Sequence, residues 1–280
     1  MNVKFSVITI NYNNAQGLVN TIKSVIEQDY KNFEYIIIDG GSTDGSTEII
    51  TQYQNHIDYS VSEKDNGIYH AINKGIKAAS GDYVIFMNSG DRFYDTHTLT
   101  AYVDNITSSE YGVYYGNSIG LFQSNNQVQL KQPEDLNLSF WFFNSLSHQA
   151  TAINRKLFDV YGLYDENMEI TSDWQYFVEL FLLRNVKFKY IDRDMAYYDM
   201  HGISSDPAMA AKNLNEREIF IKERLPQFWE EYTILKELRS PTHKRQTHFE
   251  YIQTFPFAYR ILKSFMDLIL LFLPSNKEKK

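Results

Sequence analysis

Four short apolar segments in the first third of the chain constrain the fold more than any other feature. Each is a run of β-forming residues that ends in polar turn-formers, and the runs are Phe5–Ile10, Phe33–Ile38, Ile57–Val61 and Asp82–Met87. Segments of helical periodicity lie between them. Because the runs are apolar without internal alternation, they predict a mostly parallel sheet that is covered by helices on both faces, an α/β fold.

The polar residues that follow these runs are the first indication of a functional site. Asn11, Tyr12 and Asn13 follow the first run, Asp39 ends the second, and Asp91 comes shortly after the fourth. Ligands of such sheets bind beyond the carboxyl ends of the strands. We therefore expect these side chains to face one crevice.

The pattern changes after Tyr114 to short mixed strands, aromatic loops and a helix near Ser172–Leu183. Strands are expected around Val186–Ile191 and Ala196–Met200. We expect residues 118–205 to complete the sheet begun by residues 1–117 and to form the other wall of the crevice. The residues from 206 to 280 are expected to be a helical C-terminal extension.

Composition excludes several classes of protein. The chain has no cysteine, which excludes disulfides and thiolate metal sites and fits a cytoplasmic protein. Polar residues interrupt the apolar run at the start of the chain, so this run is expected to be a strand and not a secretory signal. The net charge of −8 argues against nucleic-acid binding.

The C-terminal tail differs from the body in charge. From Lys236 to Lys280 it carries nine Lys and Arg against four Asp and Glu. Its apolar part, Phe257–Leu273, has polar residues on one helical stripe, and the segment Phe265–Leu273 is, as a helix, too short to span a bilayer. Three interpretations stay open: a helix packed on the body, a helix packed on another copy in a homo-oligomer, or an interfacial helix on a membrane.

Several common catalytic motifs are absent from the sequence. There is no HExxH pair for zinc, no GxSxG elbow, no GxxxxGK[ST] loop and no GxGxxG after the first strand. A zinc enzyme, a serine hydrolase, a P-loop kinase and a dinucleotide oxidoreductase are therefore not supported.

Two acidic positions have both a structural and a functional interpretation. Asn88-Ser89-Gly90-Asp91 is either a solvated turn or a site where one carboxylate and substrate phosphates bind Mg²⁺. Asp173 is either a helix-start residue or a general base, and it can be a base only if it faces the same crevice as Asp91.

Taken together, the motifs resemble those of family 2 glycosyltransferases with the GT-A fold, in a subgroup of bacterial polysaccharide assembly. The resemblance covers roughly residues 4–205. It is carried by three N-terminal segments and by shorter downstream ones: 6–13, 37–46, 81–91, His148-Gln149, 155–158, 162–166 and Ser172-Asp173-Trp174.

The resemblance implies a role for each matched residue. Residues 1–117 would bind the nucleotide-sugar and residues 118–205 the acceptor. The implied nucleotide-sugar residues are Asn11, Tyr12, Asp39, Asp65, Lys74 and Asn88. The implied metal ligand for Mg²⁺ or Mn²⁺ is Asp91, the implied general base is Asp173, and the implied acceptor-binding residues are His148, Gln149 and Trp174.

The sequence departs from the family pattern at two places. The family signature often reads Asp-Ser-Asp-Asp, and here Asn88 and Gly90 replace two of its carboxylates. A family Arg that often contacts the nucleotide falls at Ile72, so Lys74 or Asp65 would take its place. The metal signature therefore depends on one carboxylate.

The resemblance implies an inverting transferase that moves sugar from a nucleotide-diphosphate sugar, UDP-linked, to a saccharide or lipid-linked acceptor in cell-surface polysaccharide synthesis. It would work in the cytoplasm or at the inner face of the cytoplasmic membrane. The alternative is a non-catalytic, glycosyltransferase-like binding or scaffold subunit. A sugar nucleotidyltransferase is disfavoured because residues 11–17 contain neither Lys nor Arg.

Overall fold

A computed structural model describes residues 2–108, 110–122, 126–200, 202 and 207–270. The chain divides into two compact units, Met1–Glu223 and Arg224–Lys280. The first unit contains the sheet and every predicted site residue.

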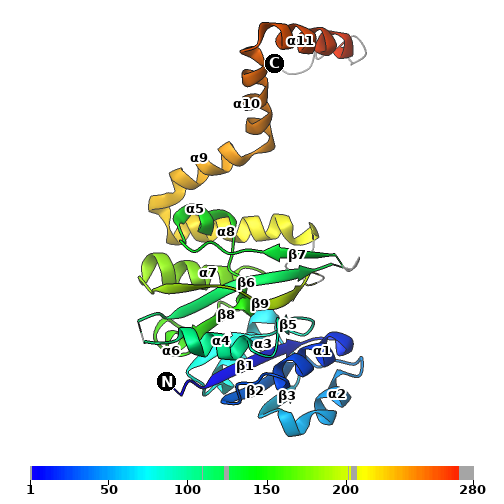
Figure 1. Ribbon diagram of the computed structural model, residues 1–280, viewed down its shortest axis with the longest axis vertical. Helices are drawn as coiled ribbons and strands as arrows, with labels where there is room; N and C mark the ends of the chain where they lie inside the picture. Colours follow the sequence, from blue (N-terminus) through cyan, green and yellow to red (C-terminus); the bar gives the residue numbers. More distant parts are fainter. Residues whose placement is uncertain (1, 109, 123–125, 201, 203–206, 271–280) are drawn as a thin grey trace. The chain divides into compact units, whose positions relative to one another are not determined.

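One sheet runs through the first unit. Its strands are β1 (Phe5–Asn11), β2 (Phe33–Asp39), β3 (Tyr59–Ser62), β4 (Tyr83–Phe86), β5 (Arg92–Phe93), β6 (Val113–Leu121), β7 (Gln127–Leu130), β8 (Thr151–Asn154) and β9 (Phe188–Asp199). The order is β3-β2-β1-β4-β8-β6-β9-β5, with β7 paired to β6 (Figure 1).

The sheet is mixed: its first half is parallel as predicted, and its second half combines parallel and antiparallel pairs. β1, β2, β3 and β4 pair in parallel as predicted. β8 is antiparallel to both β4 and β6, β7 forms a hairpin with β6, and β5 is antiparallel to β9. A hairpin needs no helical crossover, so the loss of the strand–helix alternation after Tyr114 marks this change. The two strands predicted at 186–191 and 196–200 are one strand, β9.

Helices lie between and after the strands. They are α1 (Ala15–Ile26), α2 (Ser46–Gln52), α3 (Ile68–Ala78), α4 (Thr98–Asn105), α5 (Leu138–Phe143), α6 (Lys156–Tyr161), α7 (Ser172–Val178), α8 (Ala210–Arg224), α9 (Trp229–Arg239), α10 (Pro241–Gln253) and α11 (Pro256–Leu270). A π-helical turn, Glu179–Leu183, continues α7. The predicted α/β class and helical C-terminal tail are confirmed.

β1 is buried along its whole length because both of its faces are covered. Phe5 and Val7 belong to one core cluster with Leu18 of α1. Ile8, whose side chain points the opposite way, packs against Gly75 of α3. This two-sided burial is what the apolar run without alternation predicted.

Gly75 allows α3 to approach the sheet closely. A Cβ at this position would lie 2.4 Å from Cγ2 of Ile8 and 3.6 Å from Cγ1 of Ile38. Both isoleucines are fully buried, so they have little room to move away. The close approach matters for the site, because α3 also carries Tyr69 and Lys74.

The second unit is helical, and its last helix has an exposed apolar stripe. Phe257, Ile261, Phe265 and Leu268 of α11 are 53–76% exposed. On its other side α11 packs against α10 through the rings of Tyr259 and Phe249. Within the described range, no helix has the length and apolar character to cross a membrane.

We expect Gly75→Ala to destabilise the protein, although alanine normally favours a helix. Overpacking of a core costs about 1–3 kcal/mol, which exceeds the gain of roughly 0.5–1 kcal/mol from replacing a helical glycine. Urea unfolding measures the change. Lys77→Ala on the exposed side of α3 is the control and should change the free energy of unfolding by less than about 0.5 kcal/mol. An equal effect of both substitutions would contradict the close-packing argument.

Candidate functional site

Asp39 ends β2 beside the end of β1 and is completely buried. Its Oδ1 accepts from Asn11 Nδ2 at 2.7 Å and from the Ser42 hydroxyl at 2.6 Å. Its Oδ2 accepts from the Ser42 backbone N–H at 2.9 Å and from the Ser62 hydroxyl at 2.5 Å. Burial alone would raise the pKa of Asp39, but these donors outweigh it and hold the pKa below its ordinary value.

These four hydrogen bonds fill the acceptor positions of the Asp39 carboxylate. The side chain therefore joins the ends of β1, β2 and β3 and fixes the loop after β2. A ligand that bonds to Asp39 must displace one of the serine hydroxyls. Its role as a contact to a nucleoside base stays a prediction.

Asp65 offers what Asp39 lacks, an acceptor without a partner. Its Oδ2 is buried and has no hydrogen-bond partner in the part of the chain that the structure describes. This oxygen and the Tyr12 ring both lie beside Gly40, at 3.5 and 3.1 Å from where a Cβ of that glycine would be. The Tyr12 side chain is 68% exposed. Tyr12 and Asp65 thus line one crevice at the ends of β1 and β2.

Lys74 and His70 of α3 hold Asp65 from the other side. Lys74 Nζ lies 2.6 Å from Asp65 Oδ1 and 2.8 Å from Glu63 Oε1, and His70 Nδ1 lies 2.9 Å from the same Asp65 oxygen. Partial burial lowers the pKa of Lys74, but the two carboxylates outweigh this and raise it. Lys74 remains charged and fixes Asp65.

The turn 88–91 lies beside the end of β1. The Ser89 N–H donates to the Ile10 carbonyl at 3.0 Å. The Thr21 hydroxyl of α1 donates to the Asp91 carbonyl at 2.6 Å and accepts from the Gly90 N–H at 3.0 Å. Sequence reasoning missed Thr21, which holds the turn in place.

Asp91 is buried at 5% exposure, and its Oδ1 accepts from the Asp199 N–H at 2.9 Å. The pKa of Asp91 is raised to about 8, chiefly by burial; the Asp199 backbone N–H lowers it, and the nearby Asp199 carboxylate raises it. The Asp199 carboxylate lies over Gly90, whose φ is 106° and whose Cβ would lie 2.6 Å from Asp199 Oδ2.

The paired carboxylates of Asp91 and Asp199 suit a divalent cation. Hard cations prefer carboxylate oxygens, and a cation relieves the repulsion between the buried Asp91 carboxylate and the partly exposed Asp199 carboxylate. No group of three or more His, Cys, Asp or Glu that could hold an ion occurs within the described ranges. The rest of the coordination shell would come from ligand or water oxygens, as is usual for Mg²⁺. Sequence reasoning missed Asp199, although it too ends a strand.

Asp173, the second residue of α7, reaches the same crevice. Its Oδ1 accepts from the Tyr69 hydroxyl at 2.9 Å, and its Oδ2 lies 3.6 Å from His148 Nδ1. The Asp173 side chain is 21% exposed. On its other side His148 Nε2 lies 3.2 Å from Asn88 Nδ2. Contacts therefore run from Asp173 through His148 to the turn that carries Asp91.

The contacts of His148 indicate its protonation. Burial lowers the pKa of His148, although the Asp173 carboxylate acts in the opposite direction, so the ring is neutral at pH 7. Since the Asn88 amide nitrogen can only donate, Nε2 accepts and the proton is on Nδ1, facing Asp173. His148 and Tyr69 thus direct polar hydrogens at Asp173.

The two other predicted acceptor residues are buried. Trp174 is 1% exposed, and its indole N–H donates to the Trp141 carbonyl at 2.8 Å. Gln149 is 3% exposed. The structure therefore does not support contact of Trp174 with an acceptor, because the helical spacing turns it into the core with Phe177.

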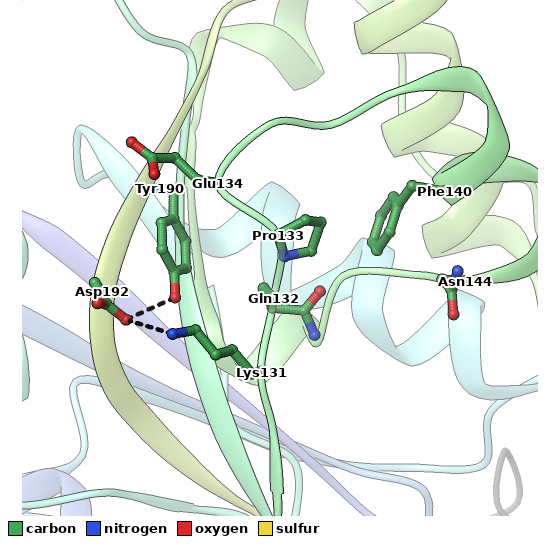
Figure 2. A pocket seen from close by; sticks show the side chains of 8 residues that line it. All are labelled: Lys131, Gln132, Pro133, Glu134, Phe140, Asn144, Tyr190 and Asp192. Atoms are coloured by element: carbon green, nitrogen blue, oxygen red, sulfur yellow. Dashed lines mark hydrogen bonds and ion pairs between the residues drawn. The ribbon is translucent and has the colours of Figure 1, made fainter.

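A cavity of about 680 Å³ lies elsewhere (Figure 2). It is lined by Lys131, Gln132, Pro133, Glu134, Phe140, Asn144, Tyr190 and Asp192. It shares no residue with the predicted site. Its Lys131 and Asp192 are 63% and 71% exposed and face each other at 3.7 Å. We place the candidate site at the strand ends instead, where buried and unpartnered polar groups converge.

Comparison with known proteins identifies the family of the chain. The family model "Glycosyl transferase family 2" matches residues 6–181. An uncharacterized glycosyltransferase of Mycobacterium tuberculosis is 32% identical over 184 residues, 64% of this chain and 69% of the relative. A PGL/p-HBAD biosynthesis glycosyltransferase of Mycobacterium bovis is 27% identical over 204 residues, 71% of this chain and 77% of the relative.

Two solved structures share the fold. One is S. aureus TarS 1-349 in complex with UDP-GlcNAc, with a TM-score of 0.64 and 21% identity over 79% of this chain and 66% of that one. The other is the mannosyltransferase PcManGT from Pyrobaculum calidifontis in complex with GDP-Man and Mn²⁺, with a TM-score of 0.61 and 15% identity over 95% of this chain and 80% of that one. The predicted GT-A fold is confirmed.

The raised pKa of Asp91 predicts how stability depends on pH when divalent cations are chelated. Between the ordinary value of 3.8 and the folded value of about 8, the folded state keeps a proton that the unfolded state has lost. This carboxyl group therefore lowers the free energy of unfolding as pH rises through that window, by up to roughly 1.4 kcal/mol per pH unit.

Asp91→Asn removes this titration and keeps an oxygen for the Asp199 N–H. We expect the free energy of unfolding of the variant to exceed that of the wild type by an amount that grows from pH 5 to pH 8 and stays constant at higher pH. Urea unfolding at several pH values with EDTA measures it. A difference that does not change with pH would contradict the raised pKa.

Proposed function

The chain belongs to glycosyltransferase family 2, and we propose that it is an inverting transferase that uses a nucleotide-diphosphate sugar, UDP-linked. The acceptor is a hydroxyl group of a saccharide or of a lipid-linked glycan in cell-surface polysaccharide synthesis. The UDP-GlcNAc complex of TarS, which shares the fold, supports the donor class. The relative in PGL/p-HBAD biosynthesis supports a role in glycan assembly.

The observation that carries this proposal is the run of contacts from Asp173 through His148 to Asn88. A general base and a diphosphate site must flank the same anomeric carbon. The sequence left open whether Asp173 faces the crevice of Asp91. Asn88 and Asp91 belong to one turn, in which the Asp91 N–H donates to the Asn88 carbonyl at 2.9 Å. The contacts through His148 therefore link Asp173 to the turn that carries Asp91.

Asp173 acts as the base in a single displacement. The acceptor oxygen bonds to the anomeric carbon, the bond from that carbon to the diphosphate breaks, and the acceptor proton passes to the Asp173 carboxylate. An ordinary aspartate is a weak base, so the transfer comes late, when the acceptor oxygen has become acidic. Tyr69 and the neutral His148 orient the carboxylate by directing polar hydrogens at it.

Asp91 and Asp199 would hold the divalent cation, Mg²⁺ or Mn²⁺. When bound, the cation supplies Lewis-acid stabilisation of charge on the departing diphosphate. PcManGT, which shares the fold, is in complex with Mn²⁺. Asp91 holds a proton at neutral pH without a cation, so it would have to lose that proton to act as a ligand.

The nucleoside occupies the crevice of Tyr12 and Asp65. The exposed Tyr12 ring suits stacking on a base, and the unpartnered Asp65 Oδ2 suits a ribose hydroxyl or a base N–H. Asn11 and Asp39 shape the loop below, and Lys74 keeps Asp65 in place. Residues 1–117 thus form the donor half of the domain and residues 118–205 the acceptor half, with His148 at the boundary.

The alternative is a non-catalytic scaffold subunit. Its best support is the loss of the family carboxylates at Asn88 and Gly90. The buried Asp91 with Asp199 beside it, and an Asp173 that is accessible and oriented, favour catalysis. Metal-dependent release of UDP from a panel of UDP-sugars separates the two functions.

We further propose that α11 binds an anionic membrane surface, which places the enzyme at the inner face of the cytoplasmic membrane. Its exposed apolar stripe is Phe257, Ile261, Phe265 and Leu268. The exposed Arg260 and Lys263 lie on the same helix, whose described part, Pro256–Leu270, is roughly 22 Å long and by itself too short to span a bilayer. An apolar stripe beside cations suits the interface of an anionic lipid layer.

Asp173→Asn should keep donor binding and lose turnover. Removal of a general base costs about 10²–10⁴-fold in rate, whereas Asp173 is not among the nucleoside residues. UDP release from the donor measures turnover, and the donor-induced thermal shift with Mn²⁺ measures binding. Asp104→Asn, an exposed carboxylate on α4, is the control and should match the wild type. Normal turnover by Asp173→Asn would refute the base assignment.

Ile261→Asp together with Phe265→Asp should abolish binding to vesicles of phosphatidylcholine and phosphatidylglycerol, because charges replace the apolar stripe. Flotation measures binding, and the wild type should bind less at high salt. Val160→Asp, which replaces an exposed valine on α6, is the control. Unchanged flotation together with altered sedimentation would instead indicate a contact between copies of the chain.

A further inference from the structure

Glu216 of α8 is a buried carboxylate, 8% exposed, that binds the segment directly before α7. Its Oε1 accepts from the Glu169 N–H at 3.0 Å. Its Oε2 accepts from the Ile170 N–H at 3.2 Å, the Thr171 N–H at 3.1 Å and the Thr171 hydroxyl at 2.8 Å. A single side chain thus fixes three consecutive residues that come 45–47 positions earlier in the chain.

The segment depends on Glu216 because α7 has no cap of its own. Thr171 precedes the helix, but its side chain makes no capping hydrogen bond to it. The Thr171 hydroxyl donates to Glu216 and accepts from Gln175 Nε2 at 3.2 Å. Backbone N–H groups at the start of a helix need acceptors, and the carboxylate of α8 supplies them for the residues just before it.

α8 also holds the residue on the other side of Asp173. The Arg217 guanidinium lies 4.6 Å from the centre of the Trp174 ring, and the Phe220 ring packs edge-on against it at 5.4 Å. α8 therefore fixes Thr171 and Trp174, while Asp173 between them faces the crevice.

We propose that Glu216 is a positioning residue that sets the place of the Asp173 carboxylate relative to Tyr69 and His148. The proposal rests on the proposed function, because it takes Asp173 as the base. Tyr69 and His148 contact the Asp173 carboxylate itself, whereas the backbone of α7 sets the position of the residue that carries this carboxylate. A displacement of ~1 Å at a catalytic group can cost about 100-fold in rate. Glu216 contacts neither the turn 88–91 nor the crevice of Tyr12, so donor binding does not depend on it.

Glu216→Gln tests the proposal, because an amide group has one acceptor oxygen and turns an N–H₂ toward N–H donors. We expect kcat for UDP release to fall about tenfold or more, with an unchanged dissociation constant for the donor. Lys212→Ala is the matched control on the same helix: it removes an exposed ion pair with Glu169 and leaves the Glu216 bonds intact. This variant should keep the wild-type kcat.

A double-mutant cycle separates positioning from general stability. If Glu216 acts through Asp173, Glu216→Gln should cause no further loss of turnover in an Asp173→Asn background. Losses that multiply would overturn the proposal. A wild-type protein that releases no UDP from any donor would contradict the proposed function, whereas an active wild type with an equally active Glu216→Gln would contradict only this inference.

Thr171→Val keeps the test open if Glu216→Gln does not fold. It removes both hydrogen bonds of the hydroxyl, to Glu216 and from Gln175, and nearly preserves the shape of a side chain that is 1% exposed. We expect a smaller fall in kcat with unchanged donor affinity. A kcat equal to that of the wild type, or a loss of donor affinity equal to the loss of kcat, would overturn the positioning role.

Discussion

The contact between Asn88 and His148 joins two parts of the sheet that the chain builds separately. Asn88 follows β4, the last strand of the parallel half, and His148 precedes β8, which pairs with β4 in the opposite direction. Because β8 is antiparallel to β4, the residue before β8 lies at the same edge as the residue after β4. The mixed topology is therefore what brings Asp173 into the crevice of Asp91, through His148. A wholly parallel sheet would place the start of that strand at the opposite edge.

The buried carboxylates differ in the number of donors that surround them, and their roles follow from it. Asp39 and Glu216 each accept four hydrogen bonds from the protein, so each acts as a rigid internal link. Asp91 accepts from the Asp199 N–H and has a carboxylate beside it, so its burial is not offset and its pKa is raised to about 8. A carboxylate that the fold does not satisfy is the one that a cation can stabilise.

The sequence predicts those parts of the fold and of the site that depend on local residue pattern and on the geometry of neighbouring strands. The apolar runs predicted β1, β2 and β4, and their ends predicted that Asn11 and Asp39 meet. Asp199 and Glu216 were missed because they act across 108 and about 46 residues, and no local pattern distinguishes them from other acidic residues. Trp174 was assigned to the acceptor because it follows Asp173. On α7 the helical period places Asp173 on the exposed face and Trp174 on the buried face. The sequence shows this period but does not show which face of the helix packs on the core.

The two substitutions within the Asp-Ser-Asp-Asp signature of the family, Asn88 and Gly90, have local physical reasons. At Gly90 the backbone has a φ of 106°, and the Asp199 carboxylate occupies the space of a side chain, so an aspartate there would be strained and would face a like charge. At position 88 an amide donates to His148, which fixes the proton on the nitrogen that faces Asp173. A carboxylate there would accept from that nitrogen instead and would favour a charged imidazole between two carboxylates. Asn88 therefore fits a neutral His148 beside Asp173, and Gly90 fits the Asp199 carboxylate above it.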